Sequence, residues 1–345
     1  MVILAVLAML VIITVLSAQL GDNSVALDHR QKVIRTREEN YQMARSAVEL
    51  AMDLLMVDTN DYDGPGDLWA FGSQRLTWEG KPLFLEIRDE EGRFPLMKLM
   101  RGEKNSEEIR PYEEALGRLL QRNGLSEKEA VASLEDWCDA DSEVRPGGGE
   151  AGAFTDIRVK NAPLDSLDEL RYVSRWGPPT LPPPDPLNAG GLFAEEAEKY
   201  KVPLEGRGAD MLETVTGQQR QDSWVKLKGA SEWSDWLTLY SAGKVNLNTA
   251  PAEVLRSLDA YMTDTVVNEL MSKRSTKALK KEDDLKQIAG VDGDLAFRLA
   301  KVAGFKSDHF RIRVVVDVRP GRMQLDAFVK RSKKGAPKVL YWKVN

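Results

Sequence analysis

The sequence predicts an α+β fold, in which a long N-terminal membrane and spine helix packs on a small antiparallel sheet and a large helical domain is inserted. Three observations lead to this prediction. An uncharged apolar run opens the chain, a helical stripe follows it as far as Leu55, and alternating strand patterns occur on both sides of a long helical region. Helices that are segregated from an antiparallel sheet define the α+β class.

The first twenty residues, MVILAVLAMLVIITVLSAQL, carry no charge, and the chain turns polar at Gly21 and Asp22. A helix rises about 1.5 Å per residue, so a run of this length spans roughly the 30 Å core of a bilayer. A cleaved signal peptide is the alternative, but it would need a basic start and a shorter apolar stretch. We therefore expect a transmembrane segment at 1–20.

A second helical pattern continues directly from the apolar run. No Gly or Pro separates Val25 from Val57, and apolar residues recur three and four positions apart. The residues of this stripe are Tyr41, Ala44, Val48, Ala51 and Leu55. An amphipathic spine helix is expected over 21–57, continuous with the membrane segment and packed on a soluble domain.

Alternating side chains predict strands in two separate parts of the chain. Leu83, Leu85 and Ile87 would face one side of a strand within 58–104, the first part of the sheet domain. Three further alternating runs, 310–318, 323–329 and 339–344, lie within 305–345 and predict a meander. We expect these four strands to complete one sheet packed on the spine helix.

The range 105–304 is expected to form the inserted helical domain. Helical patterns occur at 113–121, 127–137 and 164–173, and Asn161 and Asp165 are candidate helix starts for the last of these. The range 177–191 contains six prolines and predicts a stiff linker or an extended loop. Beyond it, the run GKVNLNTAP (243–251) opens a helix for which Thr249 is the expected cap.

Composition excludes some site classes and leaves one question open. The single cysteine, Cys138, forbids an internal disulfide, and two histidines argue against a histidine-rich metal site or a catalytic triad. The range 298–345 carries thirteen Lys and Arg against three Asp. Such a basic end could contact nucleic acid, lipid head groups or an acidic partner, but a solvated sheet face whose lysines guard exposed edges is the favoured interpretation.

Three runs together resemble the minor pseudopilin K family of bacterial type II secretion. They are EENYQMARSAVELAMDLL (38–55), LEDWCDADSEVRPGGGE (134–150) with NAPLDSLDELRY (161–172), and GKVNLNTAPAEVL (243–255). The resemblance implies a non-enzymatic subunit at the tip of the pseudopilus that supports pseudopilus assembly and protein export. It also implies an inner-membrane anchor, a periplasmic body, and partners among the other minor pseudopilins and the exported protein.

The family's short basic leader and its prepilin peptidase site do not precede the apolar run. We therefore expect either a start codon that was placed late or a processed form of the protein. Arg30, Lys32, Arg35 and Arg37 follow the apolar run and would favour a cytoplasmic body by the positive-inside rule. A basic leader before the run would offset these charges and allow a periplasmic body.

An acidic loop is the candidate metal site. Five carboxylates lie around the glycine turn Gly147–Gly149, and hard cations such as calcium prefer six to eight oxygens from such loops. These residues are Asp136, Asp139, Asp141, Glu143 and Glu150, and Asp156 is a further candidate ligand. The resemblance makes Asp139, Asp141 and Glu150 the best candidates for calcium. Because small residues intervene before Asp156, where the family has further acids, a plain solvated loop stays an equal alternative.

The run LKQIAGVDGDLAFRL (285–299) resembles one helix-hairpin-helix motif, so the inserted domain is expected to be SAM-like or helix-hairpin-helix-like. The alternative function is accordingly a membrane-anchored DNA-binding protein of a DNA-uptake or type IV pilus-like system. In DNA-binding hairpins, backbone N–H groups and a helix N-terminus face a phosphate, which Asp292 and Asp294 would repel here. Nucleic acid is therefore not expected as a partner.

The remaining motif residues are expected to be structural. Gly290 and Gly293 would shape the hairpin, and Asn246 and Asn248 would bond loop backbone ahead of the helix that Thr249 caps. No nucleophile in the chain has an evident acid or base partner, so an enzyme is not expected.

Overall fold

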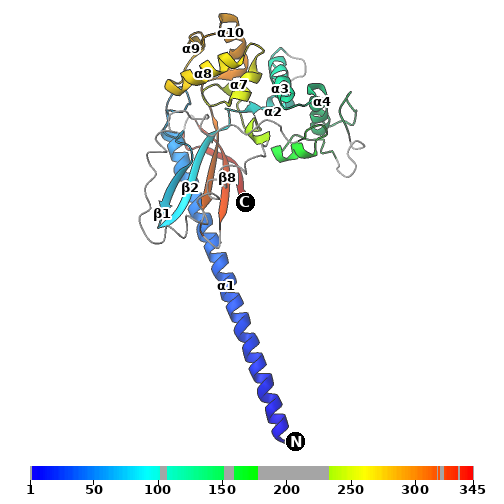
Figure 1. Ribbon diagram of the computed structural model, residues 1–345, viewed down its shortest axis with the longest axis vertical. Helices are drawn as coiled ribbons and strands as arrows, with labels where there is room; N and C mark the ends of the chain where they lie inside the picture. Colours follow the sequence, from blue (N-terminus) through cyan, green and yellow to red (C-terminus); the bar gives the residue numbers. More distant parts are fainter. Residues whose placement is uncertain are drawn as a thin grey trace.

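The computed structural model describes residues 2–101, 107–150, 159–177, 233–316, 318, 322–332 and 335–344. Helix α1 (Val2–Val57) projects far from the body, and its C-terminal part lies against a sheet (Figure 1). The other helices gather beyond the end of the sheet, on the side away from the N-terminus (Figure 1). The expected combination of a long N-terminal helix, an antiparallel sheet and a separate helical part is confirmed.

Five strands of the described chain form one antiparallel sheet in the order β1-β2-β7-β8-β9. They are β1 (Gln74–Trp78), β2 (Lys81–Asp89), β7 (His309–Val316), β8 (Met323–Lys330) and β9 (Lys338–Val344). The four predicted strands are thus confirmed, and their connection across more than two hundred residues of intervening chain places the helical part as an insertion between β2 and β7.

Strand β1 was not expected from the sequence, because its side chains are largely exposed and show no alternation. It joins β2 through a tight turn in which both Glu79 (φ 49°) and Gly80 (φ 76°) have positive φ. Positive φ at both central residues is what a type I′ hairpin requires, and Asn-Gly or Asp-Gly is its usual sequence. The Glu79-Gly80 pair is not one of these sequences, so it did not indicate a hairpin.

Helix α1 packs on one face of this sheet and forms the first of two hydrophobic cores. The predicted stripe faces this core, and Ala44, Ala51 and Leu55 are fully buried. Their partners on the sheet include Ile312 from β7, and the Trp69 ring packs on the sheet edge-to-face against Phe310. Met43 and Ala47 beside the stripe are buried as well, whereas Ile34 and Leu50 stay exposed and leave part of the α1 surface available for other contacts.

The helical part encloses the second core, which contains Leu116, Trp236, Leu255 and Leu299, all fully buried. Its helices are α2 (Leu96–Arg101), α3 (Arg110–Arg122), α4 (Glu127–Cys138), η1 (Leu167–Tyr172), η2 (Trp233–Asp235), α7 (Ala252–Leu258), α8 (Asp264–Thr276), α9 (Glu282–Leu285) and α10 (Gly293–Val302). Two short parallel pairs link its segments: β3 (Phe94–Pro95) with β4 (Leu237–Thr238), and β5 (Val245–Asn246) with β6 (Ala303–Gly304).

Two details differ from expectation. Phe94 already packs in the second core, so the helical part begins before the predicted boundary at 104/105. Neither Asn161 nor Asp165 starts a helix, because Ser166 and Glu169 form a capping box that begins η1. Asn161 instead has a positive φ of 49°. Apart from its first residue, the proline-rich range 177–191 lies outside the described residues.

Among the residues that the structure describes, no helix is long and apolar enough to cross a membrane. Several side chains within 1–26 lie outside the described set, and the transmembrane segment at 1–20 stays a prediction.

Candidate functional site

The acidic loop that follows α4 brings three of the predicted ligands together. One carboxylate oxygen from each of Asp139, Asp141 and Glu150 lies within 4.8 Å of the other two. Glu150 is only 7% exposed, and its Oε1 has no hydrogen-bond partner in the described part of the chain. Burial, followed by the charges of Asp136, Asp139 and Asp141, raises the pKa of Glu150. A bound cation would relieve this crowding of carboxylates.

The other predicted ligands do not join this group. Asp136 is fully buried, and its carboxylate accepts hydrogen bonds from the backbone N–H groups of Arg145 (3.2 Å) and Gly149 (2.8 Å). The Arg145 guanidinium pairs with both Asp136 and Asp139. Asp156 lies outside the described residues. Three carboxylates therefore fit a hard cation, while Arg145 already supplies part of the positive charge that the cation would bring.

Asn246 and Asn248 lie where the helical part meets the sheet. The amide of Asn246 donates to Asp63 O (3.1 Å), to Asp89 Oδ2 (2.9 Å) and to Ser307 Oγ (2.9 Å). The Asn248 side chain bonds both the N–H and the C=O of Leu279, each at 2.8 Å. Both amides thus fasten loops to one another, as expected of structural residues.

Thr249 does not cap the following helix. Its hydroxyl instead donates to Asp89 Oδ2 at 2.5 Å, and Pro251 takes the position before α7. The prediction failed because α7 begins at Ala252, so that Pro251 and not Thr249 holds the cap position, while the Thr249 hydroxyl is used in the contact with the sheet. Gly92 lies against the same threonine, where an added Cβ would come within 2.8 Å of Thr249 Oγ1 and 3.0 Å of its carbonyl oxygen.

The three acids at the end of β2 were not recognised from the sequence as special. Asp89, Glu90 and Glu91 are all buried, and each fastens a different segment. The Glu90 carboxylate accepts from the Thr238 hydroxyl at 2.7 Å, and the Glu91 carboxylate lies 2.6 Å from Nδ1 of His309. We refer to Asp89, Glu90 and Glu91 as the joint acids. The signal that could have identified them is a run of acids between a buried strand and a glycine.

The surroundings of Asp89 shift its pKa strongly. Burial, followed by the nearby charge of Glu91, raises the pKa of Asp89 to about 7. Hydrogen bonds from Thr249 and Ser307 act in the opposite direction but do not cancel the effect.

The α9–α10 hairpin is built for packing. Gly290 has a φ of 86°, and an added Cβ would lie 2.8 Å from Cγ2 of Val266. Asp292 caps α10 by accepting the N–H of Leu295 at 2.7 Å, and Gly293 is the first residue of that helix. The carboxylate of Asp292 therefore occupies the helix N-terminus that would face a phosphate in a DNA-binding hairpin.

The basic C-terminal range supplies internal counterions rather than only a solvated face. Arg313 pairs with Asp326 at 2.7 Å, and the buried Arg331 pairs with Asp63 at 2.7 Å. Arg311 lies in a third pair, 3.5 Å from Glu90. The expectation of a solvated sheet face is therefore wrong for these three arginines. Their charges are also unavailable to nucleic acid.

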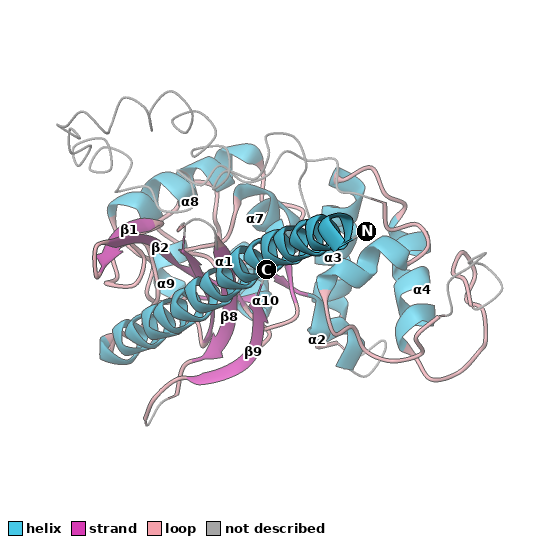
Figure 2. Ribbon diagram, turned by 90° about the horizontal axis from the view of Figure 1, so that it is seen from below, coloured by secondary structure: helices cyan, strands magenta, loops and turns pink. Residues whose placement is uncertain are grey.

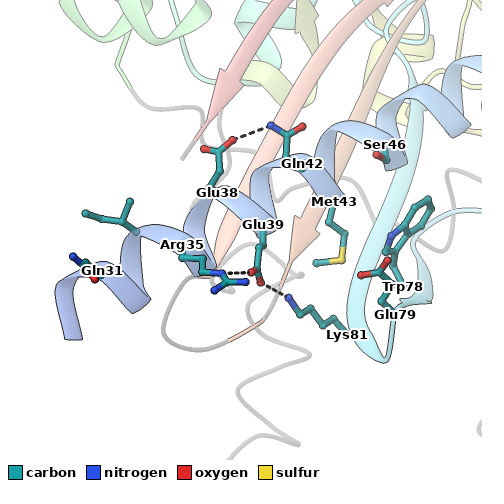
Figure 3. Close-up of a pocket in the computed structure, with 11 residues that line it drawn as sticks. Gln31, Arg35, Glu38, Glu39, Gln42, Met43, Ser46, Trp78, Glu79 and Lys81 are labelled. Atoms are coloured by element: carbon teal, nitrogen blue, oxygen red, sulfur yellow. Dashed lines mark hydrogen bonds and ion pairs between the residues drawn. The ribbon is translucent and has the colours of Figure 1, made fainter. Parts of the chain in front are cut away.

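An open groove of about 680 Å³ runs along α1 beside the β1–β2 hairpin (Figure 3). One wall is the face of α1 from Gln31 to Ser46, and the other includes Trp78 and Lys81. The Glu39 carboxylate pairs with Lys81 (2.9 Å) and with Arg35 (3.1 Å), and these bonds lower the pKa of Glu39. Ile34, Met43 and Trp78 give the groove its apolar side chains, and polar and charged side chains line the rest of it.

Comparisons with family models and with solved structures both point to proteins of type II secretion. Two family models, both described as type II secretion system (T2SS), protein K, match residues 92–183 and 245–303. The structure is similar to a chain from the crystal structure of the GspK-GspI-GspJ complex of the enterotoxigenic Escherichia coli type 2 secretion system. The TM-score is 0.60 at 16% identity, over 90% of this chain and 99% of that chain. No curated protein sequence matches the chain.

Proposed function

Because the chain belongs to the protein K family of the type II secretion system, we propose that it acts as a minor pseudopilin at the tip of the pseudopilus, where it supports pseudopilus assembly and protein export. The observation that carries this proposal is that the two family models match residues 92–183 and 245–303, which lie on either side of the stretch 184–244. We propose no catalytic role, because the hydrogen bonds of the joint acids fasten buried segments of the chain to one another.

The shape of the molecule supports a place at the end of a filament. The helical body lies beyond the sheet, on the side away from the N-terminus of α1 (Figure 1). A subunit in the middle of a filament must leave room for the next subunit above it. Here the helical body would fill that room, so growth would be possible on the side of α1 only.

The proposed partners are other minor pseudopilins, together with the exported protein. The similar solved chain comes from a complex named for GspK, GspI and GspJ. We propose the groove along α1 as one contact with such a partner. Ile34 of α1 and Trp78 of β1 are 68% and 41% exposed there, so a partner that packs in the groove would bury apolar surface.

Copurification tests this function. The full-length chain, extracted in mild detergent from cells that contain the other minor pseudopilins, is expected to bring them down. Ile34→Glu in the groove should reduce the recovered partners about tenfold, since it places a charge in an apolar contact. Leu68→Glu is the matched control, because Leu68 is 64% exposed and lies outside the groove. Recovery of no other pseudopilin with the unaltered chain would contradict the proposal.

We propose that residues 1–20 anchor the chain in the inner membrane as a single span, with the body in the periplasm. The run is uncharged, and the described side chains within it are exposed, among them Ile3, Leu10 and Ile13. The protein should resist a carbonate wash of membranes, and its body should become sensitive to protease once the outer membrane is opened. Protection of the body under those conditions would place it on the other side.

We propose that Asp139, Asp141 and Glu150 bind calcium. The buried Glu150 Oε1 without a hydrogen-bond partner supports the site, and the competing Arg145 limits it to modest affinity. Calcium should raise the melting temperature by about 2–4 °C relative to chelator, which corresponds to roughly 1 kcal/mol. Glu150→Gln should abolish this difference, whereas Glu143→Gln, on an exposed neighbour, should not. An unchanged melting temperature in the unaltered protein would exclude the site.

We further propose that the helical body is SAM-like and that its α9–α10 unit is helix-hairpin-helix-like, used for packing. The positive φ of Gly290 and the cap by Asp292 support this assignment. Neither feature calls for a nucleic-acid partner.

A further inference from the structure

Strand β9 forms one edge of the sheet, and within the described chain no strand pairs with its outer side (Figure 2). Its seven residues read KVLYWKV, which combines high β-propensity with apolar character. Leu340, Tyr341 and Val344 are each about 40% exposed. An exposed apolar edge of this length is a template on which another chain can add a strand.

The register of β9 on β8 fixes which side chains share a face. Lys338 lies opposite Lys330, Tyr341 opposite Phe328, and Lys343 opposite Asp326. A bulge between Phe328 and Val329 leaves Leu340 without an opposite residue. One face of the edge therefore presents a tyrosine flanked by two lysines.

The charges on this face are unbalanced. Lys330 and Lys338 are both exposed and lie directly opposite one another, and neither has an ion-pair partner among the described residues. Like charges in directly opposite positions destabilise a pair of strands. Lys343 lies 3.4 Å from Asp168, but both side chains are exposed, and such a pair exchanges readily for a better one. A carboxylate from outside would relieve this repulsion.

The edge is also held in place before any partner arrives. On one face, the Tyr341 ring lies 6.0 Å from the ring of Phe328 and 6.5 Å from that of Tyr240. On the opposite face, Trp342 packs edge-to-face on Tyr41 of α1 at 6.5 Å. A template that is already ordered loses little conformational entropy when a strand is added.

We propose that β9 pairs with an extended acidic segment of a neighbouring pseudopilin, which adds a strand to the sheet. The segment carries carboxylates beside Lys338 and Lys343 and an apolar side chain between them, beside Tyr341. A second copy of this chain does not fit, because its β9 carries no carboxylate to place beside Lys338 and Lys343. That the partner is a pseudopilin rests on the proposed function, whereas its chemistry follows from the edge itself.

Site-specific photo-cross-linking tests the proposal in the full-length chain, coexpressed with the other minor pseudopilins. A photoreactive amino acid at position 340 is expected to cross-link to another pseudopilin, at an extended segment rich in Asp and Glu. Lys338→Glu should reduce this cross-link about fivefold, and Lys338→Arg should preserve it. Arg75→Glu is the matched control, since Arg75 is exposed on β1, the opposite edge strand. It should leave the cross-link unchanged.

Copurification of the same samples separates the two proposals. Partners that copurify while position 340 gives no cross-link, or gives one that Lys338→Glu does not weaken, would overturn the pairing and leave the function intact. A cross-link to a second copy or to an exported protein would also overturn it. If no pseudopilin copurifies with the unaltered chain, the proposed function fails, and the partner assigned to β9 fails with it.

Discussion

Asp89 joins the sheet to the helical body through hydrogen bonds that its carboxylate accepts from Asn246, Thr249 and Ser307. Its pKa of about 7 in the folded protein lies well above the ordinary value of 3.8. Between these two values the folded state binds more protons than the unfolded state. Stability from this residue is therefore greatest at low pH and falls as the pH rises from about 4 to 7, by at most about 4 kcal/mol.

Asp89→Asn removes this titration while keeping the shape of the side chain. The free energy of unfolding of the unaltered protein should fall between pH 5 and pH 8 by about 2–3 kcal/mol more than that of the variant. Chemical denaturation in mild detergent at both pH values measures the difference. Asp53→Asn, at an exposed position of α1, is the control and should keep the dependence of the unaltered protein. Equal pH dependence in the Asp89 variant would show that this carboxylate is not perturbed.

At the scale of elements, the sequence predicts those helices and strands that bury one face, because their apolar residues recur at a regular spacing. Helix α1 and strand β2 were predicted because Ala44, Ala51, Leu83 and Leu85 recur at the helical and strand spacings and are all buried. Strand β1 escaped because it buries no face and turns through Glu79 without an Asn-Gly signal. A periodic pattern of apolar residues reflects burial of one face, so an exposed edge strand does not show such a pattern.

The candidate site was predictable only where it is local in sequence. Asp139, Asp141 and Glu150 lie within twelve positions of one another, so the acidic run marked the loop, and the family resemblance selected these three residues within it. Asp89 bonds with Asn246 across 157 positions, and Glu91 bonds with His309 across 218. Only the fold brings such residues into contact, which is why the sequence did not indicate a role for the joint acids.

The contact of α1 with the sheet should be the main source of stability of the first core. Leu55→Ala removes a fully buried side chain and should cost about 2–4 kcal/mol, whereas Met56→Ala, at a residue that is 48% exposed, should cost under about 0.5 kcal/mol. Denaturant titration of the two variants provides the comparison. Similar losses would mean that α1 does not depend on the predicted stripe for its packing.

At the scale of the whole molecule, two cores meet at the joint acids, and α1 leads away from both (Figure 1). The first core consists of a long helix packed on a sheet. A filament subunit can use such a helix to pack against the helices of its neighbours. The second core adds the helical body at the far end. In the proposed assembly, α1, the groove and the β9 edge contact neighbouring subunits, and the helical body closes the opposite end.

Labelling of pseudopili with an antibody against the helical body tests the placement at the tip most directly. Pseudopili sheared from cells that express the full-length chain are imaged by electron microscopy with gold-conjugated antibody. The account predicts gold at one end of each filament and none along its length, because the helical body prevents a further subunit from adding above it. Gold distributed along the filaments, or filaments that carry no label at all, would contradict it.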